Sequence, residues 1–183
     1  SPIVLRYNRF RCDRGWDIDL DDGSGNYHIY NNLCLNGGIK LREGFYRVVE
    51  NNIIVNNSFH PHVWFKNSGD VFTRNIVMSS YRPIQVRHWG LEVDYNIFTD
   101  STAYQKARKQ NTDAHSIVCT PAFLNPSRGD YRIDNHSDAV FRCGFRNFDM
   151  DRFGVVSPRL KALAKTPEFP KPILMEEGKA HAT

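Results

Sequence analysis

The chain has 183 residues, of which 40% are hydrophobic and 24% charged, and its formal net charge is +4. This length and composition are typical of one modest domain with a hydrophobic core. No apolar stretch approaches the roughly 18 residues of a membrane span, no run of like charges predicts a nucleic-acid partner, and the four widely spaced cysteines argue against a zinc site.

Residues 1–17 are predicted to supply one incomplete turn of a repeat. The segment Ile3-Val4-Leu5-Arg6-Tyr7-Asn8 looks like the end of a repeat unit, and Asn8 precedes Asn32 by 24 residues. The first turn of a repeat array normally needs a cap. We therefore expect further N-terminal turns, or another chain, to lie against this end.

The stretch from Ile18 to Gly90 repeats one pattern four times. Each phrase alternates apolar and polar residues with period two, as extended strands do. The phrases begin at Ile18, Ile39, Val63 and Ile84. A repeat of this size predicts a solenoid, in which stacked turns bury the apolar face that no single turn can bury.

A second apolar run follows each phrase and carries an asparagine at a matching place, namely Asn32, Asn52, Asn75 and Asn96. These residues predict an internal ladder of side-chain amides at a bend. Cys34 occupies a repeat position that is apolar in the other turns, so we expect it to be a buried thiol. Since the apolar period is two and the leucine-rich signature is absent, the sequence predicts an all-β parallel β-helix with turns of about 20 to 24 residues.

Beyond Thr99 the pattern weakens. Residues 100–116 predict a loop with a short helix over one side, and Ile117-Val118 and Tyr131-Arg132-Ile133 are candidates for the last strands. The aromatic segment from Phe145 to Gly154 is interpreted as a cover over the open end of the solenoid. We expect the β-helix to span residues 1–154 and residues 155–183 to form a partly irregular extension, with a short helix from Pro158 to Ala164 and an extended or disordered tail from Lys165.

The repeats resemble the C-terminal half of right-handed parallel β-helix proteins of the pectate-lyase-like superfamily. The resemblance also rests on Pro121-Ala122-Phe123-Leu124-Asn125-Pro126, Gly129-Asp130-Tyr131-Arg132-Ile133 and Gly144-Phe145. It covers residues from about Ile3 to Gly154. It implies a right-handed β-helix and a carbohydrate-active function, because the superfamily contains polysaccharide lyases, glycoside hydrolases and epimerases.

The polar positions of the four phrases predict three outward columns of side chains. Matched places give Asp19, Lys40, Trp64, Gln85 in the first column, Asp21, Arg42, Lys66, Arg87 in the second, and Asp22, Glu43, Asn67, His88 in the third. Such a strip suits an acidic or hydroxyl-rich sugar chain, which would stack on Trp64 or Trp89 and bind through its polar groups. The predicted substrate-binding residues are Asp19, Arg42, Trp64, Lys66, Arg87, His88 and Trp89.

The first functional hypothesis is hydrolysis, without a cofactor, of the glycosidic bonds of a complex polysaccharide that is either acidic or hydroxyl-rich. If adjacent turns stack at the strand spacing, Asp21 and Glu43 lie roughly 5 to 7 Å apart, which overlaps the separation in retaining glycosidases. We assign Asp21 as nucleophile and Glu43 as general acid/base, with Asp22 beside them. Glu50-Asn51-Asn52-Ile53 is similar to a segment of β-helical glycoside hydrolases such as the β-xylosidases.

The second hypothesis is a calcium-dependent lyase of the pectate type. Gly38-Ile39-Lys40-Leu41 resembles an element of calcium-dependent pectate lyases, and the resemblance implies Lys40 as the base. Asp17, Asp19 and Asp21 alternate at a spacing that oxygen-liganded ions accept, so they are candidate calcium ligands, with Asp22 next to them.

The third hypothesis is a non-catalytic glycan-binding solenoid. On any of the three, the partner is a polysaccharide or oligosaccharide, and we expect an extracellular or periplasmic protein. His60 and His62 are interpreted either as residues of a surface loop or as a loop at the edge of the binding groove, and His88 as a sugar ligand or proton carrier.

Overall fold

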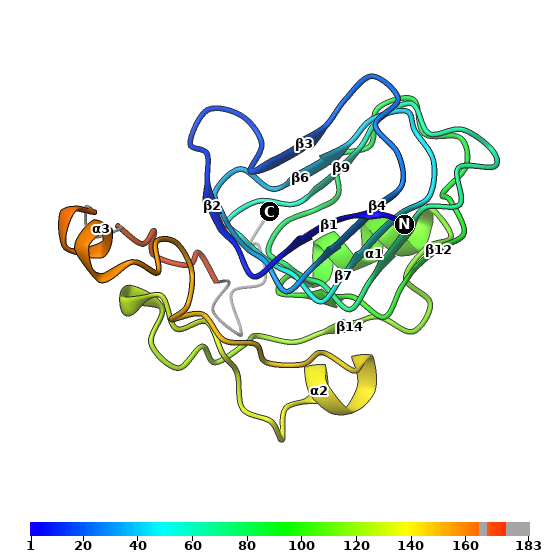
Figure 1. The fold of residues 1–183 in the computed structure, drawn as a ribbon. Helices are drawn as coiled ribbons and strands as arrows, with labels where there is room; N and C mark the ends of the chain where they lie inside the picture. The colour runs from blue at the N-terminus through cyan, green and yellow to red at the C-terminus, as the bar shows by residue number, and fades with distance from the viewer. Residues whose placement is uncertain (165–167, 175–183) are drawn as a thin grey trace.

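The computed structural model describes residues 1–164 and 168–174. It is a mostly β parallel solenoid of about six turns, with about 21 residues in each turn and few helices (Figure 1). The predicted parallel β-helix is therefore confirmed.

The strands of successive turns stack into three parallel sheets. Sheet A consists of β1 (Ile3–Arg6), β4 (Tyr27–Tyr30), β7 (Arg47–Glu50), β10 (Val71–Thr73) and β12 (Glu92–Asp94). Sheet B consists of β2 (Arg9–Arg11), β5 (Leu33–Leu35), β8 (Ile53–Val55), β11 (Ile76–Val77), β13 (Ile97–Phe98) and β14 (Ile117–Val118). Sheet C consists of β3 (Ile18–Leu20), β6 (Ile39–Leu41) and β9 (Phe59–Pro61).

The interior of the solenoid is filled by stacks of equivalent side chains from successive turns. Cys34, Ile54, Val77 and Phe98 form one such stack in sheet B, all of them fully buried, so the predicted buried thiol is confirmed. The rings of Phe59 and Phe72 stack with centroids 3.9 Å apart and join sheet C to sheet A. Parallel strands whose side chains are sequestered in this way gain most of their stability from burial.

The predicted asparagine ladder is also confirmed and extends from Asn8 to Asn96. Within it, the backbone N–H and the side-chain amide of Asn32 both donate to Oδ1 of Asn52, each at 3.0 Å. Asn52 in turn donates to Oδ1 of Asn75. The amides thus satisfy buried backbone groups at the corner between sheets A and B, where the chain leaves regular strand geometry.

Sheet B is apolar on both faces, and this decides where the C-terminal segment lies. Its outward residues Leu33, Ile53 and Ile76 form one core cluster with Phe145 and Phe148 from the C-terminal segment. The predicted position of this segment, as a cover over the open end, is therefore wrong. It covers the outer flank of sheet B, because strands with two apolar faces must be buried on both sides.

The helices lie outside the solenoid wall. They are α1 (Ser101–Lys109), the 3-10 helix η1 (Pro126–Arg128), α2 (Asp138–Cys143) and α3 (Pro158–Leu163). The predicted helix within residues 100–116 is α1, which is capped by Asp100 and packs Ala103 and Ala107 against Phe98. The strand predicted at residues 131–133 does not form, although Tyr131 and Ile133 are buried against sheet B.

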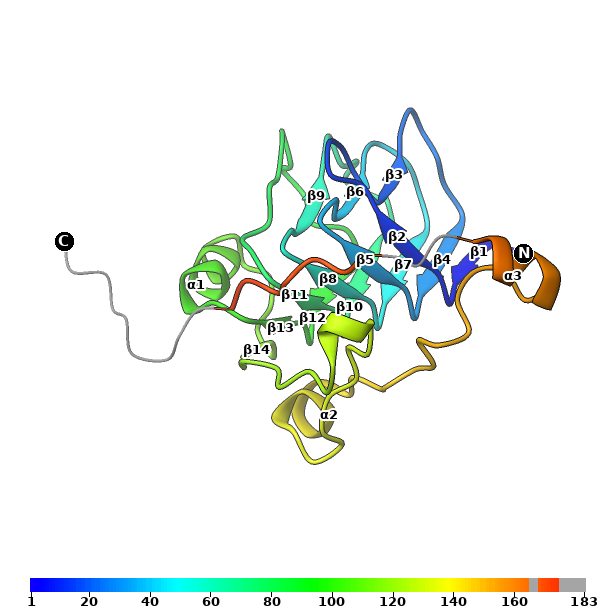
Figure 2. The ribbon, with the colours of Figure 1, turned by 90° about the vertical axis from the view of Figure 1, so that its left-hand side faces the viewer.

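Part of the predicted tail lies outside the described residues, at 165–167 and 175–183. Residues 168–174 run along the solenoid, across the strands of sheet B (Figure 2). Asn56 fixes them from both sides, since its Nδ2 donates to Lys171 O and its Oδ1 accepts from Ile173 N. Within the described ranges, no helix has the length and apolar character needed to cross a bilayer.

Candidate functional site

The outward positions of sheet C hold a compact group of charged and aromatic side chains. The register of β3 on β6 places Ile18 over Ile39, as the sequence predicts. The third strand of this sheet is Phe59–Pro61, however, and not the phrase that begins at Val63. The predicted third turn is wrong because Pro61 makes the correct segment look unlike a strand. The proline is tolerated in the sheet because His62, and not Pro61, donates the backbone N–H to Leu41 O.

The observed columns therefore differ from the predicted ones after their second member. One column is Asp19, Lys40 and His60. The next is Asp21, Arg42 and His62. Trp64 and Lys66 do not occupy these columns.

Lys40 lies at the centre of the group, and only 7% of its side chain is exposed. Its Nζ is 3.0 Å from Oδ1 of Asp19 and 3.2 Å from Oδ1 of Asp21. Burial alone would lower the pKa of this ammonium, but the hydrogen bonds and charges of the two aspartates outweigh burial and raise the pKa. A protonated Lys40 stabilises anions and is poorly suited to be the base of a lyase.

Arg42 joins the acids of two adjacent turns. Its Nε lies 2.7 Å from Oε2 of Glu43, and its Nη1 lies 3.5 Å from Oδ1 of Asp21 and of Asp22. The hydrogen bond from Lys40 is the largest cause that lowers the pKa of Asp21, and the charge of Arg42 adds to it. Asp21 is therefore ionised at neutral pH, as a nucleophile or an electrostatic stabiliser must be.

Trp16 lies beside this group. Its ring centroid is 4.3 Å from Nζ of Lys40, and its ring makes edge contacts with His60 and His62 at 6.1 Å each. Burial is the largest cause that lowers the pKa of both histidines, to about 4 for His60. Both imidazoles are thus neutral near pH 7 and can donate and accept hydrogen bonds.

Sequence reasoning missed Trp16 as a member of the site and named His60 and His62 only as loop residues, at the surface or at the edge of the groove. The interpretation of His60 and His62 as surface-loop residues is wrong, because His60 is in β9 and both side chains are buried. The signal was the alternation Phe59-His60-Pro61-His62, which starts 20 residues after Ile39. Among the described residues, no hydrogen-bond partner reaches Nε2 of His62.

A buried ion pair supports the corner that carries Arg42 and Glu43. Arg47 and Asp70 are both fully buried, and Nε of Arg47 donates to Oδ1 of Asp70 at 2.9 Å. Nη1 of Arg47 also donates to the carbonyl of Arg42. Gly44 follows Glu43 at this corner, and the close packing requires glycine there. A Cβ at this position would clash with the backbone of Ser24 and lie 2.8 Å from Nη1 of Arg47.

The predicted aromatic platforms have a different role. Trp64 is buried, and its Nε1 donates to Leu41 O at 2.9 Å, so its prediction as an exposed ring face is wrong. Trp89 packs against Trp64 and Tyr81 and is only partly exposed. The register places Trp64 in the core instead of the polar column, and Trp89 packs against the same core cluster.

Three further predicted ligands lie outside the group around Lys40. Lys66, Arg87 and His88 are exposed. Arg87 and His88 line a shallow depression together with Phe65 and the edge of Trp64. The structure thus gives these residues a separate surface, further along the solenoid than the acids.

The proposed calcium ligands do not converge. Oδ2 of Asp17 accepts hydrogen bonds from the backbone N–H of Gly37 and Gly38, at 2.8 and 3.0 Å. Asp19 and Asp21 instead bind the ammonium of Lys40. In the described part of the chain, no group of three or more His, Cys, Asp or Glu side chains could hold a metal ion. The residues present therefore do not fit the calcium site that the sequence predicts.

Comparisons of the chain with protein-family models, with curated proteins and with solved structures found no match.

Proposed function

We propose that this chain is part of a carbohydrate-active β-solenoid related to the pectate-lyase-like superfamily. In this proposal, the outward face of sheet C binds a polysaccharide outside the cell or in the periplasm, and Asp21 and Glu43 hydrolyse its glycosidic bonds. The observation that carries the proposal is that Asp21 and Glu43, from adjacent turns, contact the same guanidinium of Arg42.

The surroundings of Asp21 support its assigned role. Lys40 and Arg42 hold Asp21 ionised, so it is the group that would attack or stabilise the anomeric carbon. Glu43 is bound by Arg42 through Oε2. As the second carboxylate that contacts Arg42, Glu43 is assigned the proton transfer to the leaving oxygen and later from water, which would use its other oxygen.

The remaining side chains would bind the sugar. Trp16 offers an apolar ring at the edge of the group, and sugar rings stack on such surfaces. His60 and His62 are neutral, so each can exchange hydrogen bonds with hydroxyl groups. These contacts suit a hydroxyl-rich chain that lies across β3, β6 and β9.

One observation favours the non-catalytic alternative. Asp19, Asp21, Asp22 and Glu43 each have a cationic partner within 3.5 Å. A fully paired network is also what a structural or purely binding surface would contain. The experiment must therefore separate binding from turnover.

Release of reducing ends should be measured on neutral and uronic-acid polysaccharides, together with binding to the same substrates. Asp21→Asn and Glu43→Gln should each lower the rate by about 10²- to 10⁴-fold while binding persists. Asp130→Asn is the matched control, because this acid pairs with Arg132 away from sheet C. Binding without turnover in the parent protein would support the non-catalytic alternative, and an unsaturated product would support a lyase. Full activity of both variants on a verified substrate would refute the hydrolase.

A further inference from the structure

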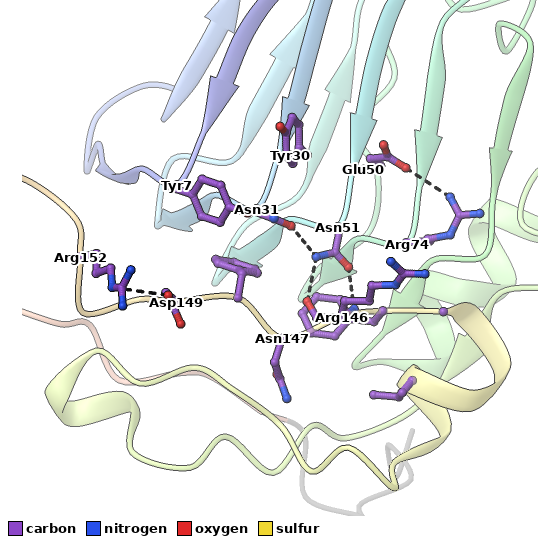
Figure 3. A pocket seen from close by; sticks show the side chains of 14 residues that line it. Tyr7, Tyr30, Asn31, Glu50, Asn51, Arg74, Arg146, Asn147, Asp149 and Arg152 are labelled. Carbon is purple, nitrogen blue, oxygen red and sulfur yellow. Dashed lines mark hydrogen bonds and ion pairs between the residues drawn. The ribbon is translucent and has the colours of Figure 1, made fainter.

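A groove lies at the corner between sheets A and B, between the solenoid and the C-terminal segment (Figure 3). One wall is the solenoid corner, and the other is the C-terminal segment around residues 144–149. The solenoid wall consists of Tyr7, Tyr30, Asn31, Glu50, Asn51 and Arg74. The groove has a volume of about 1380 Å³, which exceeds that of a typical small-molecule pocket. It therefore has room for an elongated ligand.

The corner presents one side chain from each turn in a regular row. The residues of this row all have a left-handed backbone conformation, with φ between 54° and 57°: Tyr7, Asn31, Asn51, Arg74 and Tyr95. Asparagine adopts this conformation easily, whereas tyrosine and arginine do so at a cost.

The two walls are held at a fixed separation. Asn51 binds the backbone of Arg146 twice, since its Oδ1 accepts from Arg146 N at 2.7 Å and its Nδ2 donates to Arg146 O at 2.8 Å. The same Nδ2 donates to Oδ1 of Asn31. Phe145 and Phe148 anchor the outer wall in the core. The groove is therefore preorganised, which lowers the entropy cost of binding.

The charges in the groove favour an anion. Glu50 is already bound by His28 at 2.8 Å and by Arg74 at 3.3 Å. Asp149 lies 3.5 Å from Arg152. Arg146 is exposed and has no ion-pair partner within residues 1–164 and 168–174. Arg146 can thus bind a carboxylate without losing an ion-pair partner, whereas Arg74 would share its guanidinium between Glu50 and the ligand.

Tyr7 and Tyr30 add an aromatic surface and a hydrogen-bonding hydroxyl, both of which can bind a sugar. The hydroxyl of Tyr30 accepts a hydrogen bond from Arg6 at 2.8 Å and keeps its own proton to donate. Tyr7 is 43% exposed and lies edge-on to Tyr30. Aromatic rings next to hydrogen-bonding groups and a cation form a surface that suits a carboxylated sugar.

We propose that this groove is a separate binding site for a uronic-acid oligosaccharide, independent of any hydrolysis at sheet C. The row of corner side chains would follow the chain of sugars, and Arg74 and Arg146 would bind their carboxylates. The neutral oligosaccharide of the same length and linkage would bind more weakly, because it cannot form the charge-assisted bonds.

Calorimetric titration with these two oligosaccharides tests the site, in an Asp21→Asn background so that the ligand is not consumed. Tyr7→Asn and Arg74→Gln should each weaken binding of the acidic oligosaccharide by about tenfold. Tyr7→Asn should remain folded, because asparagine tolerates the left-handed conformation. The matched control is Tyr46→Asn, since Tyr46 is also left-handed and exposed but lies outside the groove and should leave affinity unchanged.

The outcomes separate this site from sheet C. Affinity lost in Tyr7→Asn and Arg74→Gln but retained in Trp16→Ala supports the groove, whether or not the parent protein is a hydrolase. Affinity lost in Trp16→Ala alone overturns the groove and supports sheet C as the binding face. Equal affinity of the groove variants and Tyr46→Asn, or equal affinity for the acidic and neutral ligands, also overturns it.

Discussion

Arg47 and Asp70 form an ion pair with both side chains completely removed from solvent. Two nitrogens of the guanidinium and the backbone N–H of Arg47 all donate to the Asp70 carboxylate. The remaining Nη1 reaches the carbonyl of Arg42, so this pair connects the core to the candidate site.

Asp70→Ala should destabilise the protein by about 3–5 kcal/mol, because it leaves a buried guanidinium without its partner. The free energy of unfolding in urea measures the effect. Asp130→Ala removes a more exposed ion pair with Arg132 and should cost about 1 kcal/mol or less. Similar losses in the two variants would contradict the importance assigned to the buried pair.

Asn52→Ala should lower the free energy of unfolding by about 2–4 kcal/mol, since it leaves several buried backbone and amide groups of the ladder unpaired. Asn52 donates to Ile29 O and Glu50 O and accepts from Asn32. Asn135, which is exposed and bonds only to another side chain in the described structure, provides the control. An Asn135→Ala variant as unstable as Asn52→Ala would argue against the ladder.

Asp17 should make stability depend on pH. Burial raises the pKa of Asp17 to about 7, against the hydrogen bonds from Gly37 and Gly38 that would lower it. Between about pH 4 and pH 7 the folded state therefore binds more protons than the unfolded chain, and stability falls as the pH rises. Asp17→Asn should be more stable than the parent at about pH 8, by at most about 4 kcal/mol, with a much smaller difference at about pH 4.

The comparison of Asp17→Asn with its parent at each pH isolates this effect. Burial lowers the pKa of His60 to about 4, so His60 alone would make stability rise between about pH 4 and pH 6.5. That opposite trend is present in both proteins and cancels. A difference in unfolding free energy that does not change with pH would show that Asp17 is not protonated in the folded state.

Gly44→Ala should destabilise the corner that carries Glu43, by about 1–3 kcal/mol, because the added methyl meets backbone of Ser24 and the Arg47 guanidinium. Gly15→Ala is the control, since a Cβ at Gly15 meets only the sulfur of Cys12, at 3.3 Å. Thermal unfolding of the two variants gives the comparison. Identical midpoints would mean that the corner can relax around the methyl group.

Much of the architecture could be predicted from local patterns. The period of the apolar phrases predicts the solenoid. The register of Ile18 over Ile39 is predicted correctly because both strands have the same alternation, with Ile18 and Leu20 matching Ile39 and Leu41. The recurring asparagines predict the ladder, since each must satisfy backbone groups at the same bend. Cys34 is buried for the same reason as its apolar equivalents.

The third turn could not be predicted in this way. Two alternating segments, at Phe59 and at Val63, compete for one place in sheet C, and proline makes the correct one look like a loop. Packing decides between them: Phe59 stacks on Phe72 and is fully buried, whereas Val63 has a left-handed backbone outside the sheet. With this shift, Trp64 moves into the core, and His60 and His62 move into the candidate site.

The sequence by itself determined that the chain forms stacked turns and which types of residue fill the core, because an apolar face must be buried in every turn. Only the tertiary structure decided the protonation states and the interaction partners of the charged groups. Lys40 forms ion pairs with Asp19 and Asp21, and Arg42 forms one with Glu43. Asp17 instead accepts hydrogen bonds from two backbone amides. These contacts join different turns, and the choice of partner depends on distance and desolvation in three dimensions, which the order of residues along the chain does not contain.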